Sequence, residues 1–132
     1  MCFGCGTKNP RGLQLTFELD PAARRIRTRW TPAKEHQGYA DIVHGGMTGL
    51  VLDELMANLL WKLNCPSVTA ELTVKFLRPA RVGEPLDCEA WVVSEKGFLR
   101  GRVYQMRAMA RRSGRVVAEA SGRCIQLHGG VK

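Results

Sequence analysis

No stretch of the sequence is long and apolar enough to be expected to cross a membrane. The longest apolar run, residues 47–61, is shorter than the ~20 residues of a membrane-spanning helix, and it carries Asp53 and Glu54 in its middle. Met1 is followed directly by Cys2-Phe3-Gly4-Cys5-Gly6, without the basic and apolar regions of a secretory signal. We therefore expect a cytoplasmic protein that does not insert into membranes.

Cysteine is too sparse for a disulfide scaffold. The five cysteines are odd in number and scattered over 132 residues, which is typical of a chain in a reducing compartment. Cys2 and Cys5 form one Cys-x-x-Cys pair, but structural zinc usually takes four ligands from two close pairs, and the sequence offers no second pair. We therefore expect no metal, and a packed or flexible N-terminal lead-in over residues 1–12.

Internal repeats, low-complexity segments and the features of nucleic-acid recognition are also missing. A chain of 132 residues is sufficient for one core, so we expect a single domain over residues 1–132. The formal net charge of +8 favours anionic partners. Nucleic acid is disfavoured, because the one strong helix is apolar on nearly every face and no aromatic stacking set appears. The charge then leaves a polyanionic small molecule, such as a phosphorylated cofactor, or an acidic membrane surface.

The order of the predicted elements indicates an α+β fold. Alternation of apolar and polar residues predicts strands, and the apolar run predicts one buried helix that ends near Leu63. The expected strands are Leu13–Leu19, Arg24–Trp30, Thr69–Phe76, Leu86–Val93, Phe98–Arg111 and Arg115–Leu127. Ser94–Gly97 should close one strand, and Ser113-Gly114 should form a tight hairpin turn. Strands that are grouped apart from the helix favour an antiparallel sheet.

Side-chain periodicity assigns faces to two of these strands. Along 69–76, the residues Ala70, Leu72, Val74 and Phe76 share one face and Thr69 lies on the other. The last strand carries small residues on one face, which allows a helix to pack closely against it. These small residues are Val116, Ala118, Ala120, Gly122 and Cys124.

The pattern with the clearest chemical meaning is His44-Gly45-Gly46 followed by Asp53 in the predicted helix. A carboxylate in an apolar helix is costly unless it is paired, hydrogen-bonded or used in a reaction. Two glycines at the start of a helix leave backbone N–H groups that an anion or oxyanion can approach. Together, a base on the helix and donors at its start are typical of an acyl-transfer or hydrolytic site.

Three segments carry a resemblance to a known family. The first runs from Gly38 through His44-Gly45-Gly46 to Asp53-Glu54, and the second is Val68–Ala80 with Gly83. The third is the lead-in with Asn9-Pro10-Arg11-Gly12-Leu13. In these segments, and in their order, the chain resembles the hotdog-fold acyl-CoA thioesterases of the 4-hydroxybenzoyl-CoA and phenylacetate-pathway type.

The resemblance implies an antiparallel sheet wrapped around one long helix, a dimer or dimer of dimers formed through the sheet, and active sites at the dimer interface. It implies that Asp53 is the general base or nucleophile and that the Gly45 N–H polarises the thioester carbonyl. His44 would shape the loop and contact substrate, and Thr69 would hold the attacking water or the carboxylate. No cofactor is implied beyond the coenzyme A of the substrate.

Substrate contacts are expected from the loop before the helix and from basic residues. Several relatives carry Asn or Gln six residues before the histidine of the first segment, whereas this chain has Gly38 there. Either Gln37 takes over that contact or the backbone donors act alone. Gly46 is expected at the thioester. Arg78, Arg81 and the turn from Lys96 to Arg100 are our candidates for the coenzyme A phosphates.

Spacing along the helix suggests that the site is shared between two subunits. Asp53 lies about two helical turns, or roughly 10 Å, from the start of the helix, which is too far for it to act comfortably beside Gly45 of the same chain. Two other functions stay open: a module that binds acyl-CoA without turnover, as a sensor or carrier, and a hotdog hydratase or dehydratase.

Overall fold

In the part of the chain that the structure describes, one α-helix and six strands follow each other in the order expected from the sequence. The computed structural model describes residues 1–98 and 101–127. The elements are β1 (Glu18–Asp20), β2 (Arg25–Trp30), a short 3-10 turn η1 (Lys34–His36), α1 (Gly45–Lys62), β3 (Val68–Phe76), β4 (Leu86–Phe98), β5 (Gly101–Arg112) and β6 (Arg115–Leu127). Predictions of an α+β fold and of a helix that ends near Leu63 are confirmed.

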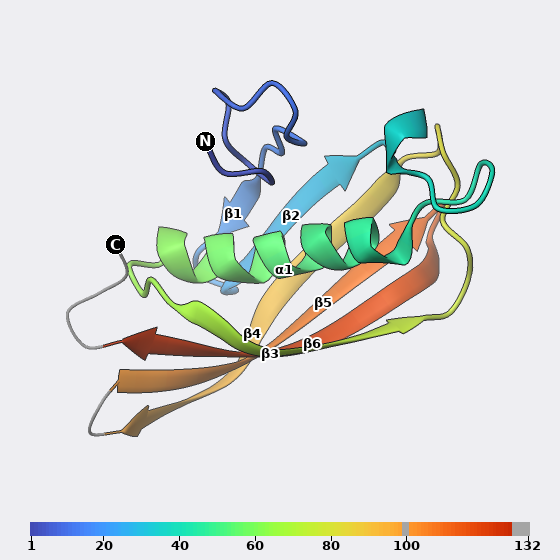
Figure 1. Cartoon of the computed structure of the whole chain (residues 1–132). Helices are drawn as coiled ribbons and strands as arrows, with labels where there is room; N and C mark the ends of the chain where they lie inside the picture. The colour runs from blue at the N-terminus through green and yellow to red at the C-terminus, as the bar shows by residue number, and fades with distance from the viewer. Residues whose placement is uncertain (99–100, 128–132) are drawn as a thin grey trace.

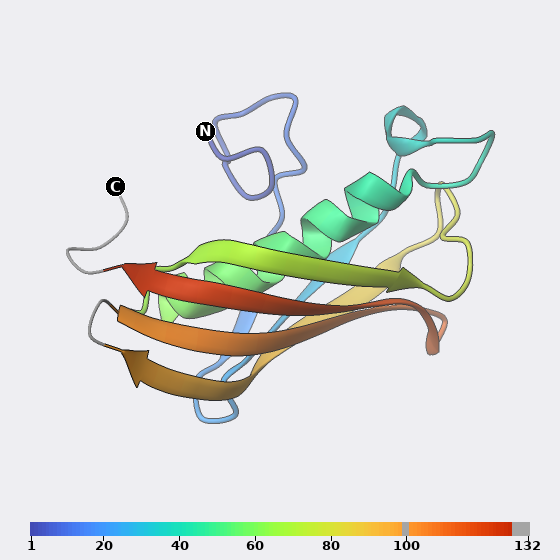
Figure 2. The ribbon, with the colours of Figure 1, turned by 60° about the horizontal axis from the view of Figure 1, so that its bottom comes forward.

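The six strands form one antiparallel sheet in the order β1-β2-β4-β5-β6-β3. Helix α1 lies across one face of this sheet, and the sheet curves around it (Figure 1). No element of the described residues covers the opposite face, as the view in Figure 2 shows. Strand β3 comes directly after the helix in the chain but pairs with β6 at the edge of the sheet.

The core lies between α1 and the concave face of the sheet. Six side chains of the helix are completely buried, which explains why this segment is apolar on most of its faces. They are Val51, Leu52, Leu55, Met56, Leu59 and Leu60. The sheet contributes small residues where the helix approaches most closely: a Cβ added to Gly122 would lie 2.9 Å from Cε of Met56.

Three predicted strand boundaries are wrong, and one of them is the start expected at Phe98, which is the last residue of β4 and not the first of β5. Residues 13–17 are not a strand, because the Leu13 and Leu15 N–H groups donate to the carbonyl groups of Phe3 and Gly4 in the lead-in instead of to a neighbouring strand. Ser94–Gly97 does not close a strand, since β4 continues through it to Phe98 after a register shift between Val92 and Ser94. Residues 99 and 100, including the candidate phosphate ligand Arg100, lie outside the described residues.

A bulge in β6 changes which of its side chains face the core. Arg111 pairs with Val116 whereas Ala110 pairs with Ala118, so Val117 is the extra residue of a bulge. As a result Val117 is buried in the core at 2% exposure, in the place where alternation predicted Val116. The other four small residues of this face are buried as expected.

Within residues 1–98 and 101–127, no helix is long and apolar enough to cross a membrane.

Candidate active site

The start of α1 is organised by His44, which is its N-cap residue. Its Nδ1 atom accepts a 2.9 Å hydrogen bond from the Gly46 N–H, so Nδ1 carries no proton. The carbonyl oxygen of His44 accepts from the N–H of Met47 at 2.9 Å and of Thr48 at 3.4 Å. Among the described residues, the Gly45 N–H has no acceptor, which makes it the one free donor in the first turn.

A cavity of about 440 Å³ opens at this end of the helix. Its size falls within the range of small-molecule sites. Gly45 lies beneath the ring of Phe76, because a Cβ at Gly45 would be 3.1 Å from Cζ of that ring. Arg78 is held at the cavity by its guanidinium group, which donates to the Val116 carbonyl. The lining also includes Gly38, Tyr39, Ile42, Val43, His44, Gly45, Thr48, Leu77, Pro79, Ala80, Val117 and Ala118.

Asp53 and Thr69 meet on the helix-facing side of the sheet. Thr69 Oγ1 donates a 2.7 Å hydrogen bond to Asp53 Oδ1, and both side chains are half-buried. Strict alternation would have placed Thr69 on the other side of β3. A bulge between Thr69 and Glu71 corrects the register, so that Thr69 pairs with the buried Cys124. The contact expected from the resemblance is therefore present, although the predicted face of Thr69 is wrong.

Cys124 is a neighbour of this pair that the sequence did not reveal. Burial raises the pKa of its thiol, and the nearby Asp53 charge raises it further, while a hydrogen bond with Thr69 opposes both. The thiol therefore stays protonated at neutral pH and is a poor nucleophile. Cys124 on β6 pairs with Thr69 on β3, and this pairing could have identified it as a neighbour. The pairing can be predicted only when the bulge in β3 is known.

The two halves of the predicted site lie apart in one chain. Gly45 lines the cavity whereas Asp53 does not, and eight residues of helix separate them by about 12 Å along the axis. The Oε1 atom of Gln37 accepts from the Asp41 N–H at 3.1 Å, so this side chain is engaged within its own loop. Arg81 is exposed and is not a lining residue, although its backbone pairs with that of Ile42, which lines the cavity.

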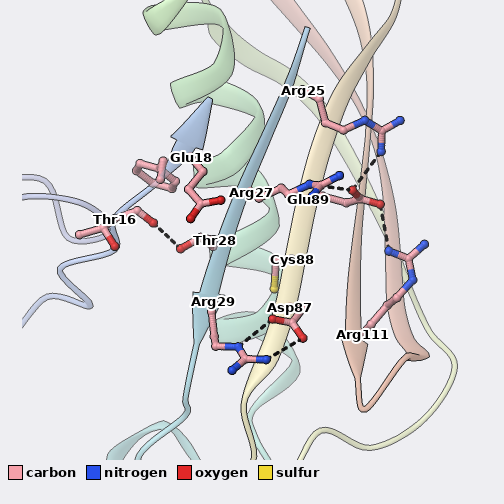
Figure 3. A pocket seen from close by; sticks show the side chains of 11 residues that line it. Thr16, Glu18, Arg25, Arg27, Thr28, Arg29, Asp87, Cys88, Glu89 and Arg111 are labelled. Carbon is pink, nitrogen blue, oxygen red and sulfur yellow. Dashed lines mark hydrogen bonds and ion pairs between the residues drawn. The ribbon is translucent and has the colours of Figure 1, made fainter. Parts of the chain in front are cut away.

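A larger cavity of about 760 Å³ lies over β2 and β4, away from the helix start. Four arginines line it, but carboxylates largely neutralise them (Figure 3). Glu89 lies between Arg25 at 3.0 Å, Arg111 at 2.9 Å and Arg27 at 3.7 Å, and Arg29 pairs with Asp87. We interpret this hollow as an ion-pair network on the sheet and place the candidate active site at the smaller cavity.

Apolar side chains on the edge strand β3, and directly after it, are largely exposed. Phe76 and Leu77 are 56% and 51% exposed, and Leu72 is 36% exposed. Trp61, near the end of α1, is 59% exposed. An unpaired edge with a row of exposed apolar residues is the type of surface that commonly pairs with another chain.

The model of the thioesterase superfamily matches residues 40–97, which run from the loop before α1 through β3 and most of β4. No curated protein sequence matches the chain. Among solved structures, the fold is similar to that of a thioesterase superfamily protein, with a TM-score of 0.81 and 24% identity over 89% of this chain. This chain spans 59% of the length of that protein.

Two further structures share the fold over most of both chains. One is a putative thioesterase from Ralstonia eutropha described as phenylacetic acid degradation-related, with a TM-score of 0.74, 24% identity, and coverage of 86% of this chain and 85% of that one. The other is a hypothetical thioesterase protein with coenzyme A from Streptococcus pneumoniae, with a TM-score of 0.74, 17% identity, and 92% coverage of both chains. Residues 40–97 thus resemble the thioesterase superfamily, and the chain shares the hotdog fold of these structures.

Proposed function

We propose that this protein hydrolyses acyl-CoA thioesters to a free acid and coenzyme A. The observation that carries the proposal is the free N–H of Gly45, which lies at the start of α1 in the wall of the 440 Å³ cavity. The positive end of the helix dipole and a free N–H favour negative charge at the same point. A thioester carbonyl oxygen there would gain charge in the transition state next to a donor that is already in position.

Asp53 would act as the general base or as the nucleophile. As general base, its carboxylate takes a proton from water, the hydroxyl oxygen attacks the thioester carbon, and the C–S bond breaks to release the thiolate of coenzyme A. A positioned base of this kind typically contributes about 10²–10⁴-fold to the rate. Thr69 fixes one carboxylate oxygen through its 2.7 Å hydrogen bond. No cofactor beyond the coenzyme A of the substrate takes part.

A second copy of the chain would bring the two halves of the site together. Along α1 and β3, Gly45 lies against Phe76 near the end of the strand and Asp53 lies against Thr69 near its start. If β3 pairs antiparallel with β3 of the partner subunit, and the two strands are centred on each other, the start of one strand lies beside the end of the other. Thr69 of one subunit would then lie near the last residues of β3 in the partner. Asp53 would then approach Gly45 of the partner subunit. The exposed Phe76 and Leu72 support this pairing.

Coenzyme A is the proposed carrier for two reasons. The related protein from Streptococcus pneumoniae was crystallised with coenzyme A, and the net charge of +8 favours a ligand with several phosphates. Arg78, at the cavity, is our first candidate for a phosphate contact. Gly46 lies next to the proposed donor, but its N–H is engaged by His44, so we assign it a shaping role at the thioester.

A thiol-release assay across short, medium, long and aromatic acyl-CoAs tests the proposal. We expect hydrolysis of at least one class, and we expect Asp53→Asn to reduce its rate by several hundredfold while circular dichroism and acyl-CoA binding stay unchanged. Asp41→Asn is the matched control, because Asp41 is an exposed loop residue outside the cavity lining. If Asp53→Asn hydrolyses every substrate as fast as the wild type, the assignment of Asp53 is wrong.

One observation favours a second function, the binding of acyl-CoA without turnover. Several members of the family that the sequence resembles carry Asn or Gln where this chain has Gly38, and the neighbouring Gln37 side chain accepts a hydrogen bond from the Asp41 N–H. The same panel separates the two functions. Ligand-induced thermal stabilisation without any thiol release would favour the binding module.

A further inference from the structure

The fold brings three metal-ligating side chains together at the N-terminal lead-in. The Sγ atoms of Cys2 and Cys5 and a carboxylate oxygen of Glu54 all lie within 4.8 Å of one another. Cys2 Sγ is 3.1 Å from Glu54 Oε1, although 52 residues separate them in sequence. We expected no metal because the sequence offers no second cysteine pair. The structure supplies Glu54 as a third ligand instead.

The lead-in is shaped around this cluster. The Gly6 N–H donates to the Cys2 carbonyl at 2.9 Å, which closes a turn that holds the two cysteines on one side. A Cβ at Gly4 would lie 2.5 Å from Cδ of Glu54, and a Cβ at Gly6 would lie 2.5 Å from the Cys2 nitrogen. Both distances are shorter than real Cβ contacts, so a side chain at Gly6 would displace the backbone of Cys2, and one at Gly4 would displace the Glu54 side chain from the cluster. The two glycines therefore let the loop pass directly over the carboxylate.

Glu54 has no cation to balance its charge in the part of the chain that the structure describes. It is half-buried on α1, and no Lys or Arg of residues 1–98 or 101–127 forms an ion pair with it. Its Oε1 atom instead accepts from Asn58 Nδ2 at 2.9 Å, and the same amide approaches Cys5 Sγ at 3.9 Å. A half-buried carboxylate between two sulfurs is a donor set that a divalent cation completes.

We propose that Cys2, Cys5 and Glu54 bind a divalent cation of the zinc class, with the fourth position open to solvent beside the exposed Cys2. Two sulfurs favour zinc over magnesium or calcium, which take oxygen ligands. In a tetrahedral site with Zn–S of about 2.3 Å and Zn–O of about 2.0 Å, the ligand atoms lie about 3.5–3.8 Å apart, so small side-chain shifts suffice here. Both thiols lose their protons to solvent on binding.

The proposed ion would fasten the lead-in to α1. In Figure 1 the lead-in forms a loop above the middle of α1, from which the chain continues into β1. Its anchors among the described residues include backbone hydrogen bonds from Leu13 to Phe3 and from Leu15 to Gly4, and the contacts of the cluster. The Gln14 side chain also donates to the carbonyl groups of Thr7 and Asn9. Since Glu54 is adjacent to Asp53, the ion would also stiffen the turn of the helix that carries the proposed base. Asn58 would orient Glu54 as an outer partner.

The test uses the full-length chain, purified under reducing conditions and titrated with Zn²⁺ and with Co²⁺. We expect one equivalent per chain, thiolate-to-Co²⁺ charge-transfer absorption with tetrahedral ligand-field bands, and a higher Tm with Zn²⁺. Cys2→Ser and Cys5→Ser should abolish the absorption, and Glu54→Gln should weaken affinity at least tenfold. Asn58→Ala should weaken it by about 10–100-fold. Cys65→Ser and Glu35→Gln are matched controls outside the cluster, and they should bind as the wild type does.

Three results would overturn the proposal. One is a reduced, folded wild-type protein that takes up neither Zn²⁺ nor Co²⁺ at micromolar concentration. Another is loss of binding in Cys65→Ser as large as that in Cys5→Ser. The third is metal uptake that persists in folded Cys2→Ser and Cys5→Ser, with folding checked by circular dichroism in each case. The readouts are independent of thioester hydrolysis, so the outcome does not depend on the proposed function.

Discussion

Thr69 donates a 2.7 Å hydrogen bond to Asp53, and this bond exists because β3 carries a bulge between Thr69 and Glu71. The bulge adds one residue and turns the Thr69 side chain from the outer face of the sheet to the face that contacts α1. The other carboxylate oxygen of Asp53, Oδ2, accepts no hydrogen bond from the described residues. The arrangement holds one oxygen and leaves the other available to a water molecule or a thioester.

Removal of the Thr69 hydroxyl should therefore reduce activity without unfolding the protein. Thr69→Val keeps the shape of the side chain but cannot donate a hydrogen bond. The Asp53 carboxylate then loses the one hydrogen-bond donor that it has among the described residues. A hydrogen bond to a charged group contributes about 1.5–3 kcal/mol, and we expect kcat for thiol release to fall by about tenfold or more. Thr69→Ser, which retains the donor, should recover most of the rate.

The neighbouring Thr73→Val is the matched control, because Thr73 is exposed and lies on the same strand away from Asp53. An unchanged kcat in Thr69→Val, with wild-type thermal stability, would show that the hydroxyl has no part in the reaction.

The free N–H of Gly45 can be removed by one substitution. Gly45 is the first residue of α1, where proline is well tolerated because its missing N–H has no intrahelical acceptor. His44, with φ −60° and ψ 128°, already has the extended conformation that a following proline requires. We expect Gly45→Pro to lower kcat by about 10²–10³-fold, the effect typical of losing one oxyanion donor.

Gly45→Ala separates this effect from crowding. Its Cβ would also approach the Phe76 ring, at 3.1 Å from Cζ, but the N–H is retained. We expect this variant to keep most of its kcat in the thiol-release assay, with any loss confined to KM. Equal losses in the two variants would mean that the space beneath Phe76, and not the donor, determines the rate.

The sequence was sufficient to predict the elements whose pattern is local. The hairpin turn at Ser113-Gly114 was expected from its residue types, and both residues have positive φ, 48° and 80°, as a tight two-residue turn requires. The buried helix was expected because apolar residues occur on nearly every face of this segment. Both predictions depend on neighbours within a few residues of one another.

The features that were missed depend on contacts between distant segments. The lead-in takes the hydrogen-bonding groups of Leu13 and Leu15, so a segment with a strand-like pattern does not join the sheet. The bulges at Thr69 and Val117 shift the register by one residue, which alternation along a single strand cannot reveal. For the same reason the sequence could offer Asp53 and Thr69 as candidates, but it could not place Cys124 beside them, or Glu54 beside Cys2 and Cys5.

Mixed dimers should test whether one site uses two chains. If Asp53 acts beside Gly45 of the partner subunit, a dimer of one Asp53→Asn chain and one Gly45→Pro chain contains one intact site and one doubly altered site. After random exchange of subunits, about half of the dimers are mixed, so we expect about a quarter of the wild-type activity. Each variant alone should be nearly inactive. A mixture that stays at the level of the separate variants, although native mass spectrometry detects mixed dimers, would place both residues in one chain.

The ion pairs around Glu89 should make stability depend on pH. Burial raises the pKa of the Glu89 carboxyl group, but hydrogen bonds and charges from Arg111 and Arg25 outweigh burial, so the pKa is lower than its ordinary value of 4.5. A lowered pKa in the folded state means that the unfolded chain binds the proton first as the pH falls. The contribution is therefore complete above about pH 5 and is lost progressively as the pH falls through the folded pKa.

Glu89→Gln removes this contribution. In urea unfolding at pH 7, we expect the free energy of unfolding to fall by about 2 kcal/mol, since charged hydrogen bonds from Arg25 and Arg111 are lost. The difference between wild type and variant should shrink as the pH is lowered from about 6 to about 3. Glu119→Gln is the matched control, because Glu119 is half-buried on β6 and forms no ion pair within the described ranges of the chain. A wild-type-to-variant difference that stays constant over this range would exclude Glu89 as the source of the pH dependence.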